Sequence, residues 1–264
     1  MDSKTGVLHF LPPTPLTQGS DIIVSVLDSV VTATASHTTW RDMVLSVARK
    51  TVFSTASSWT VCANLTISNS GQGCAVISGS NNTIKDCLIF GCGSVAISIT
   101  SGDTLSLAHG NSSVIGNTLA NSSRVQRTYT PSVRFSGCGI RVAKNVITNS
   151  PHTAISGYGN DHLFENNSIR HACYGSSDVG AFYVGRSWSQ RGNIVRFNQF
   201  RDIRATEKLS QQPASSIAFY LDDQMSGYDF CEYGIVLAFT PEPASCTPRR
   251  QTCLPACLPR RPGC

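Results

Sequence analysis

The sequence predicts an all-β fold, a single-domain parallel β-helix in which short strands wind into stacked coils. Three observations support this prediction. A loose phrase of apolar residues around an Asn or Cys recurs through the middle of the chain. Short segments rich in Val, Ile, Phe and Tyr are bounded by turns of Gly, Asn, Asp and Ser, as strands are. No segment of helical length keeps a 3.6-residue apolar period.

The recurring phrase sets the length of one coil. Its copies read VCANLTI, IKDCLIF, IGNTLA, VAKNVI, FENNSI and VRFNQF, aligned on Asn64, Cys87, Asn117, Asn145, Asn167 and Asn198. The spacing is about 22 to 31 residues, which lies in the range of solenoid repeats. Asparagines at one turn of successive coils can take a left-handed backbone conformation and bond between rungs through their amides. We therefore interpret the asparagine column as architecture rather than catalysis.

The repeat divides the 264 residues into three segments. We expect residues 1–60 to hold a lead-in and the first coils, residues 61–230 the β-helix, and residues 231–264 an irregular tail rich in Cys, Pro and Arg. A chain of this length with 41 % hydrophobic residues can bury a sizeable core in one domain.

Charge and hydropathy exclude several kinds of partner. The net charge is +5, part of it in the tail pairs Arg249-Arg250 and Arg260-Arg261, and no Lys/Arg stripe argues for nucleic acid. No apolar run reaches the length of a membrane helix. The first residues contain no secretory leader, whereas five N-x-[S/T] motifs favour secretion if a leader is missing. The motifs begin at Asn64, Asn81, Asn111, Asn121 and Asn166. We expect a monomer.

The eleven cysteines do not form a metal motif in the sequence. Cys253 and Cys257 have a suitable spacing, but no His accompanies them in the Pro- and Arg-rich tail. The body cysteines are expected to pack as small hydrophobes, and their disulfide state stays open. No metal ligand is predicted.

Two phrases carry a resemblance to a known family. DVGAFYVGRSW (178–188) has the form D-x-G-A-x-Y-x-G-R-x-W, and AFYLDD (218–223) repeats its AFY and ends in two carboxylates. With the coil phrases of 137–203 and DSKTGVLHFLPP (2–13), they resemble right-handed parallel β-helix repeat proteins of the pectate-lyase-like superfamily. The chain is most similar to β-helical glycoside hydrolases of the α-L-fucosidase or xylanase type, and looks like a truncated member.

The resemblance implies a pair of catalytic aspartates, Asp178 and one of Asp222 and Asp223. Aligning the two AFY phrases puts Gly185 beside Asp222 and Arg186 beside Asp223, on adjacent coils. An extended strand from Asp178 to Gly185 would span about 23 Å. The chain must therefore bend at Gly180 or Gly185 if the pair is to form. Otherwise the pair is different, and Arg186 and Asp223 are simply an ion pair.

Other side chains near these phrases are candidates for contact with a sugar. Tyr183 and Trp188 offer aromatic faces for stacking, whereas Tyr220 is expected to pack inward. Arg186 and Arg191 suit an acidic sugar or a pair of hydroxyls. His162, predicted to lie in a turn, is a candidate proton carrier.

Three functions remain open at this level. The first is a glycoside hydrolase that acts on a poly- or oligosaccharide through paired aspartates. The second is a catalytically inactive β-helix that binds glycan or serves as a scaffold. The third is a Ca²⁺-dependent polysaccharide lyase, with the Asp222-Asp223 pair as oxygen ligands. No other cofactor is expected, and the sugar, the linkage and the stereochemistry stay undetermined.

Overall fold

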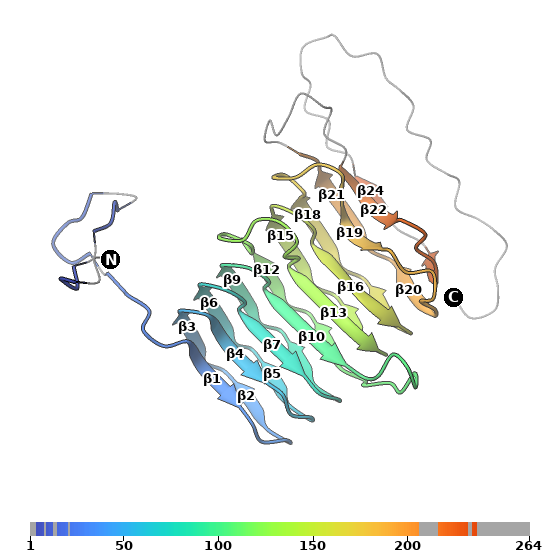
Figure 1. Cartoon of the computed structure of the whole chain (residues 1–264), viewed down its shortest axis with the longest axis horizontal. Helices are drawn as coiled ribbons and strands as arrows, with labels where there is room; N and C mark the ends of the chain where they lie inside the picture. Colours follow the sequence, from blue (N-terminus) through green and yellow to red (C-terminus); the bar gives the residue numbers. More distant parts are fainter. Residues whose placement is uncertain are drawn as a thin grey trace, which may run out of the picture.

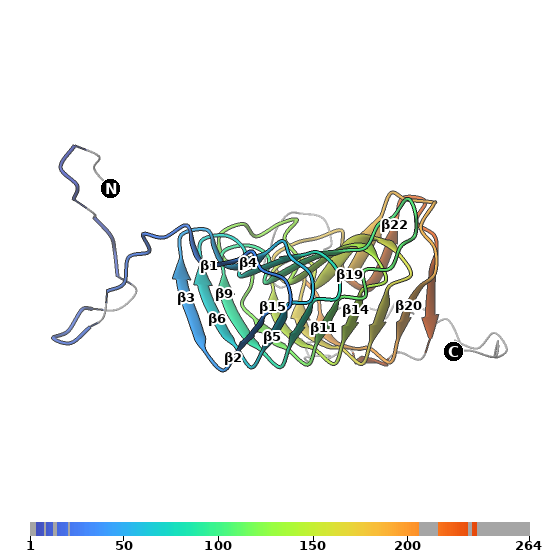
Figure 2. The same cartoon turned by 90° about the horizontal axis from the view of Figure 1, so that it is seen from below.

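A computed structural model describes residues 4–7, 9–12, 15–20, 22–205, 216–231 and 234–236. It shows three eight-stranded sheets in which all neighbouring strands pair in parallel. The chain visits the sheets in a fixed order, so that β1, β2 and β3 make the first coil and β4 begins the second (Figures 1 and 2). This is the right-handed parallel β-helix that the sequence predicts.

The first sheet, sheet A, consists of β1 (Ser29–Ala33), β4 (Thr51–Thr55), β7 (Ala75–Ser78), β10 (Ile97–Ser101), β13 (Val133–Cys138), β16 (Ile155–Asn160), β19 (Val179–Gly185) and β22 (Ser216–Asp222). Sheet B consists of β2 (Thr39–Arg41), β5 (Val61–Ala63), β8 (Thr83–Lys85), β11 (Ser113–Ile115), β14 (Arg141–Ala143), β17 (Leu163–Glu165), β20 (Asn193–Arg196) and β23 (Tyr228–Cys231). Sheet C consists of β3 (Val44–Ala48), β6 (Thr66–Ser70), β9 (Leu88–Cys92), β12 (Thr118–Ala120), β15 (Val146–Ser150), β18 (Ser168–Ala172), β21 (Gln199–Ile203) and β24 (Gly234–Val236).

The core is built from inward columns that run along the coils. In sheet C one column consists of residues that pair with one another from strand to strand and are at most 1 % exposed. Its members are Ile67, Ile89, Leu119, Ile147, Ile169 and Phe200. Equivalent columns from sheets A and B meet it, where the Phe164 ring contacts Phe135 at a tilt and Phe182 edge to face. Each such side chain contributes about 1.5–3 kcal/mol by leaving water.

The corner between sheets B and C is two residues long in every described coil. The first adopts a left-handed backbone, with φ between 51° and 68°. These residues are Asp42, Asn64, Asp86, Gly116, Lys144, Asn166 and Phe197. The second points inward, and from the fourth coil on it is Asn117, Asn145, Asn167 and Asn198, all at most 3 % exposed.

The inward asparagines form a hydrogen-bonded ladder, as the sequence predicts. Asn117 Nδ2 donates to Asn145 Oδ1 at 3.0 Å, and Asn145 and Asn167 repeat the bond to the next coil. Two details of the prediction are wrong. Asn64 lies in the exposed left-handed position and Leu65 takes the inward one. The left-handed conformation therefore belongs to the residue before each ladder asparagine, because the asparagine itself leads directly into the next strand.

The cysteines divide into one disulfide and several buried thiols. Cys74 and Cys92, on neighbouring coils, are bonded with their Cα atoms 5.5 Å apart. Cys62, Cys87 and Cys173 are free and buried in the core, so they pack as the sequence predicts. Cys138 is also free and buried, but its sulfur contacts Asp161 Oδ2. Burial raises the pKa of the Cys62 and Cys173 thiols to about 12, which keeps both protonated and unreactive.

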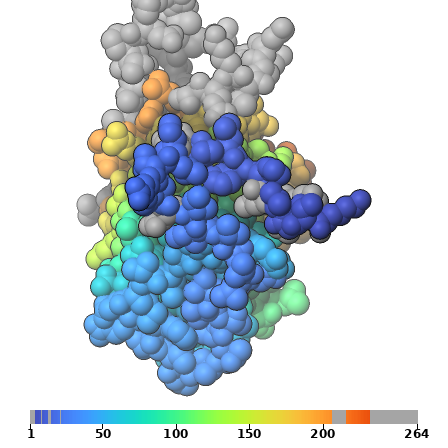
Figure 3. Space-filling model, turned by 90° about the vertical axis from the view of Figure 1, so that its left-hand side faces the viewer, coloured from blue at the N-terminus to red at the C-terminus, as the bar shows by residue number. Residues whose placement is uncertain are grey.

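The described solenoid begins inside the first predicted segment and ends inside the last. The first strand begins at Ser29, and Figure 3 shows the blue residues of the first coils at this end. At the other end β24 pairs with β21 although it lies inside the segment predicted as an irregular tail. The rest of that tail lies outside the described residues. In the described part of the chain, no helix has the length and apolar character required to cross a membrane.

Candidate functional site

The two phrases that carry the predicted site lie on adjacent strands of sheet A. In the pairing of β19 with β22, Tyr183 lies opposite Tyr220 and Gly185 opposite Asp222. This register confirms the alignment of the two AFY repeats. The backbone N–H of Arg186 continues the pairing by donating to the carbonyl oxygens of Asp222 and Asp223.

Asp178 comes directly before β19, which pairs with β22 in one register from Val179 to Gly185, so the expected bend at Gly180 or Gly185 does not interrupt the strand. A Cβ atom at Gly180 would lie 2.7 Å from both the Phe182 carbonyl oxygen and the Tyr220 Cβ, so only glycine fits there. Asp178 itself has a left-handed backbone, with φ 55°. The Tyr220 hydroxyl donates to Asp178 Oδ1 at 2.9 Å.

A second hydrogen bond completes a group of four side chains, which we call the aspartate–tyrosine cluster: Asp178, Tyr183, Tyr220 and Asp222. The Tyr183 hydroxyl donates to Asp222 Oδ2 at 2.7 Å. The two tyrosine rings meet edge to face, with centroids 5.5 Å apart. The expected inward packing of Tyr220 is wrong, because its hydroxyl bonds outside the core and Phe219 packs inward instead.

The electrostatics of the cluster keep both phenols protonated at neutral pH. Burial, followed by the hydrogen bond to Asp222, raises the pKa of Tyr183 to about 12. The hydrogen bond to Asp178, followed by burial, raises the pKa of Tyr220 to about 12. Each phenol therefore acts as a donor that orients one carboxylate.

Arg186 and Asp223 form the ion pair that the alignment suggests. Arg186 Nε lies 3.1 Å from Asp223 Oδ2, and both side chains are well exposed. Water screens such a pair, so its effect is mainly to position the two groups beside the cluster. Asp222 and Asp223 thus bind different partners, and their carboxylates do not converge on one point. In the described residues, neither belongs to a group of three metal-ligating side chains.

The two remaining candidates, Trp188 and Arg191, lie in the corner that follows β19 but have different neighbours. Trp188, 78 % exposed, lies in the corner 186–192, and its carbonyl accepts a bond from Ser226 Oγ in the next coil's corner. The indole is therefore free to meet a ligand from solvent. Arg191 lies at the far end of that corner, with its Nε 3.9 Å from Asp161 Oδ1. Arg191 therefore belongs to the group of side chains around Asp161 and not to the aspartate–tyrosine cluster.

His162 lies inside the coil rather than in a solvated turn, so the expected contact with a sugar is not compatible with its position. It is 1 % exposed, and its Nδ1 accepts the Ile140 N–H at 3.1 Å. The backbone N–H of His162 donates to Asn193 Oδ1, which makes His162 one rung of an inner column at the corner between sheets A and B. Burial lowers the pKa of His162 to about 4, so it is neutral at pH 7.

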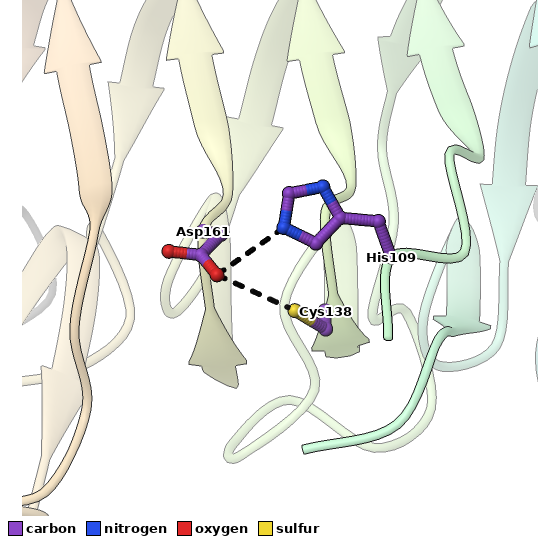
Figure 4. A group of neighbouring side chains, drawn as sticks. All are labelled: His109, Cys138 and Asp161. Carbon is purple, nitrogen blue, oxygen red and sulfur yellow. Dashed lines mark hydrogen bonds and ion pairs between the residues drawn. The ribbon is translucent and has the colours of Figure 1, made fainter. Parts of the chain in front are cut away.

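A second group of side chains was not found from the sequence: His109, Cys138 and Asp161 (Figure 4). They come from three successive coils at the corner between sheets A and B, and Asp161 contacts both of the others. Asp161 Oδ2 lies 3.2 Å from His109 Nε2 and 3.7 Å from Cys138 Sγ. The repeat did not predict this group, because the corner 102–112 is long and the position of His109 in its coil cannot be read from the spacing of the repeat.

A surface hollow of about 310 Å³ lies beside this second group, not beside the aspartate–tyrosine cluster. It is lined by Gly79, Ser80, Thr100, Ser101, Gly102, Asp103, Ala108 and His109. The cluster itself lies on the outer face of sheet A. Its surroundings therefore suit a long ligand lying across strands better than a small enclosed one.

Comparison with known proteins adds little to this geometry. No protein-family model matches the chain, and no curated protein matches it. Among solved structures, the chain is similar to an alginate lyase from Paenibacillus sp. str. FPU-7, with 13 % identity and a TM-score of 0.48 over 81 % of this chain and 78 % of the other. The assignment of the fold rests on the three parallel sheets of this chain.

Proposed function

We propose that this β-helix processes carbohydrate and that the aspartate–tyrosine cluster hydrolyses a glycosidic bond. The observation that carries the proposal is the presence of two carboxylates, on adjacent coils of one face, each oriented by a tyrosine hydroxyl. Glycosidic cleavage needs such a pair, with one group to protonate the leaving oxygen and one to activate water or attack carbon.

The cluster supplies these roles through Asp178 and Asp222. Tyr220 and Tyr183 occupy one lone pair of each carboxylate and leave the other oxygen of each free to meet a substrate. Asp223 is held by Arg186, which gives it a supporting role. The phenols limit rotation of the carboxylates, and so preserve the geometry that proton transfer requires.

The face around the cluster supports an extended saccharide. One outward row of paired residues crosses sheet A, through Ser98, Arg134, Ser156, Tyr183 and Tyr220. Tyr158, 61 % exposed, and Trp188 add aromatic surface near this row. Hydroxyl, guanidinium and aromatic groups are the contacts that sugar hydroxyls and ring faces use.

The local charge favours a neutral glycan. Three carboxylates, Asp178, Asp222 and Asp223, share the site with the single guanidinium of Arg186. A polymer of uronic acids would bring like charge to this surface, and repulsion weakens such binding. The substrate class proposed is therefore a neutral poly- or oligosaccharide.

One observation favours a second candidate, elimination by a polysaccharide lyase. The Arg186 guanidinium lies close enough to Tyr183 to lower the pKa of the phenol, although burial and Asp222 outweigh it. The guanidinium can neutralise a uronate carboxylate, and the phenol beside it can carry a proton. This reading requires that substrate displace Asp223 from Arg186.

A panel of neutral glycans and uronans, incubated with the full chain, separates these functions. Hydrolysis releases new reducing ends without ultraviolet absorbance, whereas elimination gives unsaturated, absorbing products. We expect reducing ends from a neutral glycan, and a decrease in kcat of about 10²–10⁴-fold in Asp178→Asn and Asp222→Asn. The matched control is Asp229→Asn, an exposed aspartate of β23. Unchanged turnover in Asp178→Asn contradicts the mechanism, and binding without turnover supports an inactive glycan-binding protein.

A further inference from the structure

The group formed by His109, Cys138 and Asp161 combines three different ligand atoms at one point of the surface. One nitrogen, one sulfur and one oxygen all lie within 4.8 Å of one another. They come from three successive coils: the corner 102–112, the end of β13 and the corner after β16 (Figure 4). The backbone brings the three coils together here, because the Gly110 N–H donates to the Cys138 carbonyl oxygen at 2.9 Å and the Gly139 N–H donates to the Asn160 carbonyl oxygen at 3.0 Å. The side chains of His109, Cys138 and Asp161 then meet outside this pairing.

The two distances from Asp161 Oδ2 match edges of a metal tetrahedron, and the third pair of ligand atoms lies within 4.8 Å. With ordinary Zn–N, Zn–O and Zn–S bond lengths, tetrahedral ligands are separated by about 3.4 Å for N and O and about 3.6 Å for S and O. The observed separations are 3.2 Å from His109 Nε2 to Asp161 Oδ2 and 3.7 Å from Cys138 Sγ to the same oxygen. An ion can therefore bind with only small shifts of the side chains.

The order of contacts argues against a nucleophilic triad. In such a triad a histidine lies between the nucleophile and the carboxylate. Here Asp161 lies between Cys138 and His109, so the imidazole is not the partner of the thiol. Cys138 is also fully buried, which makes attack on a substrate difficult. A shared cation explains the arrangement better than covalent catalysis does.

The surroundings restrict the three side chains as a metal site requires. Arg191 lies near Asp161 Oδ1, so that Oδ2 is directed at the other two ligands. A Cβ atom at Gly139 would lie 2.8 Å from His109 Cβ, and a side chain at Gly192 would overlap Asp161 Oδ1. Both glycines have left-handed backbones, with φ 72° and 65°. Partners of this kind orient metal ligands.

We propose that His109, Cys138 and Asp161 bind a zinc ion, with a fourth position open to water. The mixed nitrogen, sulfur and oxygen set suits Zn²⁺ and disfavours Ca²⁺ and Mg²⁺, which prefer oxygen. His109 is half exposed, which provides a path of entry from solvent. The ion clamps the long corner 102–112 onto two following coils of the solenoid. The proposal does not depend on the proposed glycosidase function.

Cobalt substitution tests this proposal directly on the full chain, reduced and free of chelator. Co²⁺ bound by a thiolate in a tetrahedral site gives a charge-transfer band in the near ultraviolet and intense ligand-field bands in the visible. We expect one equivalent of Co²⁺ to produce both, and Zn²⁺ to abolish them by displacement. Cys138→Ser should remove the charge-transfer band, and His109→Gln should weaken Co²⁺ affinity by more than about 10-fold.

Two controls identify the thiol that binds. Cys173→Ser removes a different buried thiol and should leave the spectrum unchanged. The tail cysteines remain in every variant, so a band that persists in Cys138→Ser and His109→Gln arises elsewhere and overturns the proposal. The absence of any thiolate band in the wild-type chain overturns it as well. Because His109 is at the surface, His109→Gln gives a result even if Cys138→Ser does not fold.

Discussion

The corner between sheets B and C and the corner between sheets A and B belong to the same coils but behave differently. The first has two residues in every described coil, with one backbone conformation. The second varies from two residues, at 139–140, to eleven, at 102–112. The constant corner contains the asparagine ladder. The variable corner contains Arg186, Trp188, His109 and Asp161.

The difference separates architecture from chemistry along one chain. A corner that repeats can satisfy its buried polar groups with the equivalent residue of the next coil, as the ladder does. A corner that varies keeps equivalent neighbours only for its inward residue, as at His162 and Asn193, so its other side chains bind whatever else approaches them. Functional groups are therefore expected where the repeat fails, as is common for loops on a rigid scaffold.

Removing a ladder amide should have the largest effect on stability. In Asn145→Ala, the Asn117 N–H and amide lose their acceptor, and the Val114 carbonyl and Asn167 Oδ1 each lose a donor, all in the core. We expect the free energy of unfolding to fall by about 3 kcal/mol or more. Urea unfolding measures it.

The matched control for the ladder is on the outside of the same coil. Asn149 also bonds an asparagine one coil away, Asn121, but both are near the surface, where water can replace the bond. Asn149 also bonds His171 Nδ1 and holds a left-handed backbone at φ 57°, so Asn149→Ala should cost about 1 kcal/mol, well below the loss in Asn145→Ala. Equal losses in Asn145→Ala and Asn149→Ala would show that burial does not distinguish the two rows.

A change in the aspartate–tyrosine cluster on sheet A should affect activity instead of stability. Tyr183→Phe removes the hydroxyl that orients Asp222 and keeps the ring. We expect kcat on the glycan identified above to fall about 10- to 100-fold, with the urea midpoint nearly unchanged. Steady-state kinetics and unfolding of the same preparation give both values. A large loss of stability with normal kcat would assign Tyr183 to the scaffold.

On the outer face of sheet B, a row of charged side chains links three coils and can be compared with the buried asparagine ladder. Arg141 and Arg196, from the coils on either side, both donate to Glu165. Burial opposes ionisation of Glu165, but the hydrogen bonds from the two arginines outweigh it and hold its pKa below the usual 4.5.

This depressed pKa predicts a pH-dependent contribution to stability. A carboxyl whose folded pKa is lowered stabilises the fold above its unfolded pKa, and loses this effect as pH falls through the folded pKa. Glu165→Gln should therefore cost about 1 kcal/mol at pH 7, and the difference from wild type should shrink below pH 4.5. Urea unfolding at several pH values measures the trend. A difference that stays constant with pH contradicts the assignment.

The smallest effect should be a gain at the constant corner. Lys144 is exposed and holds a left-handed backbone at φ 57°, where Gly116 stands one coil earlier. Lys144→Gly should stabilise the fold by up to about 1 kcal/mol, because glycine takes this conformation without steric cost. The same change at exposed Lys85, which lies in strand β8, should destabilise it. Thermal unfolding of the two variants compares them.

Residues that follow the repeat were predictable, and residues that depart from it were less so. The coil length, the inward apolar columns and the ladder from Asn117 to Asn198 follow from spacing alone. The ladder was misread at Asn64, because a polar residue in either corner position gives the same pattern. The register of Tyr183 with Tyr220 was predictable because both strands contain AFY.

The sequence by itself determined the solenoid, since each coil repeats a local pattern of strand, turn and inward side chain that needs no knowledge of the rest. Only the tertiary structure decided that Tyr220 bonds Asp178, that His162 is buried, and that His109 meets Cys138 and Asp161. The physical reason is the corner between sheets. Where its length is constant, sequence distance measures spatial distance; where it varies, the path of the chain decides which side chains meet.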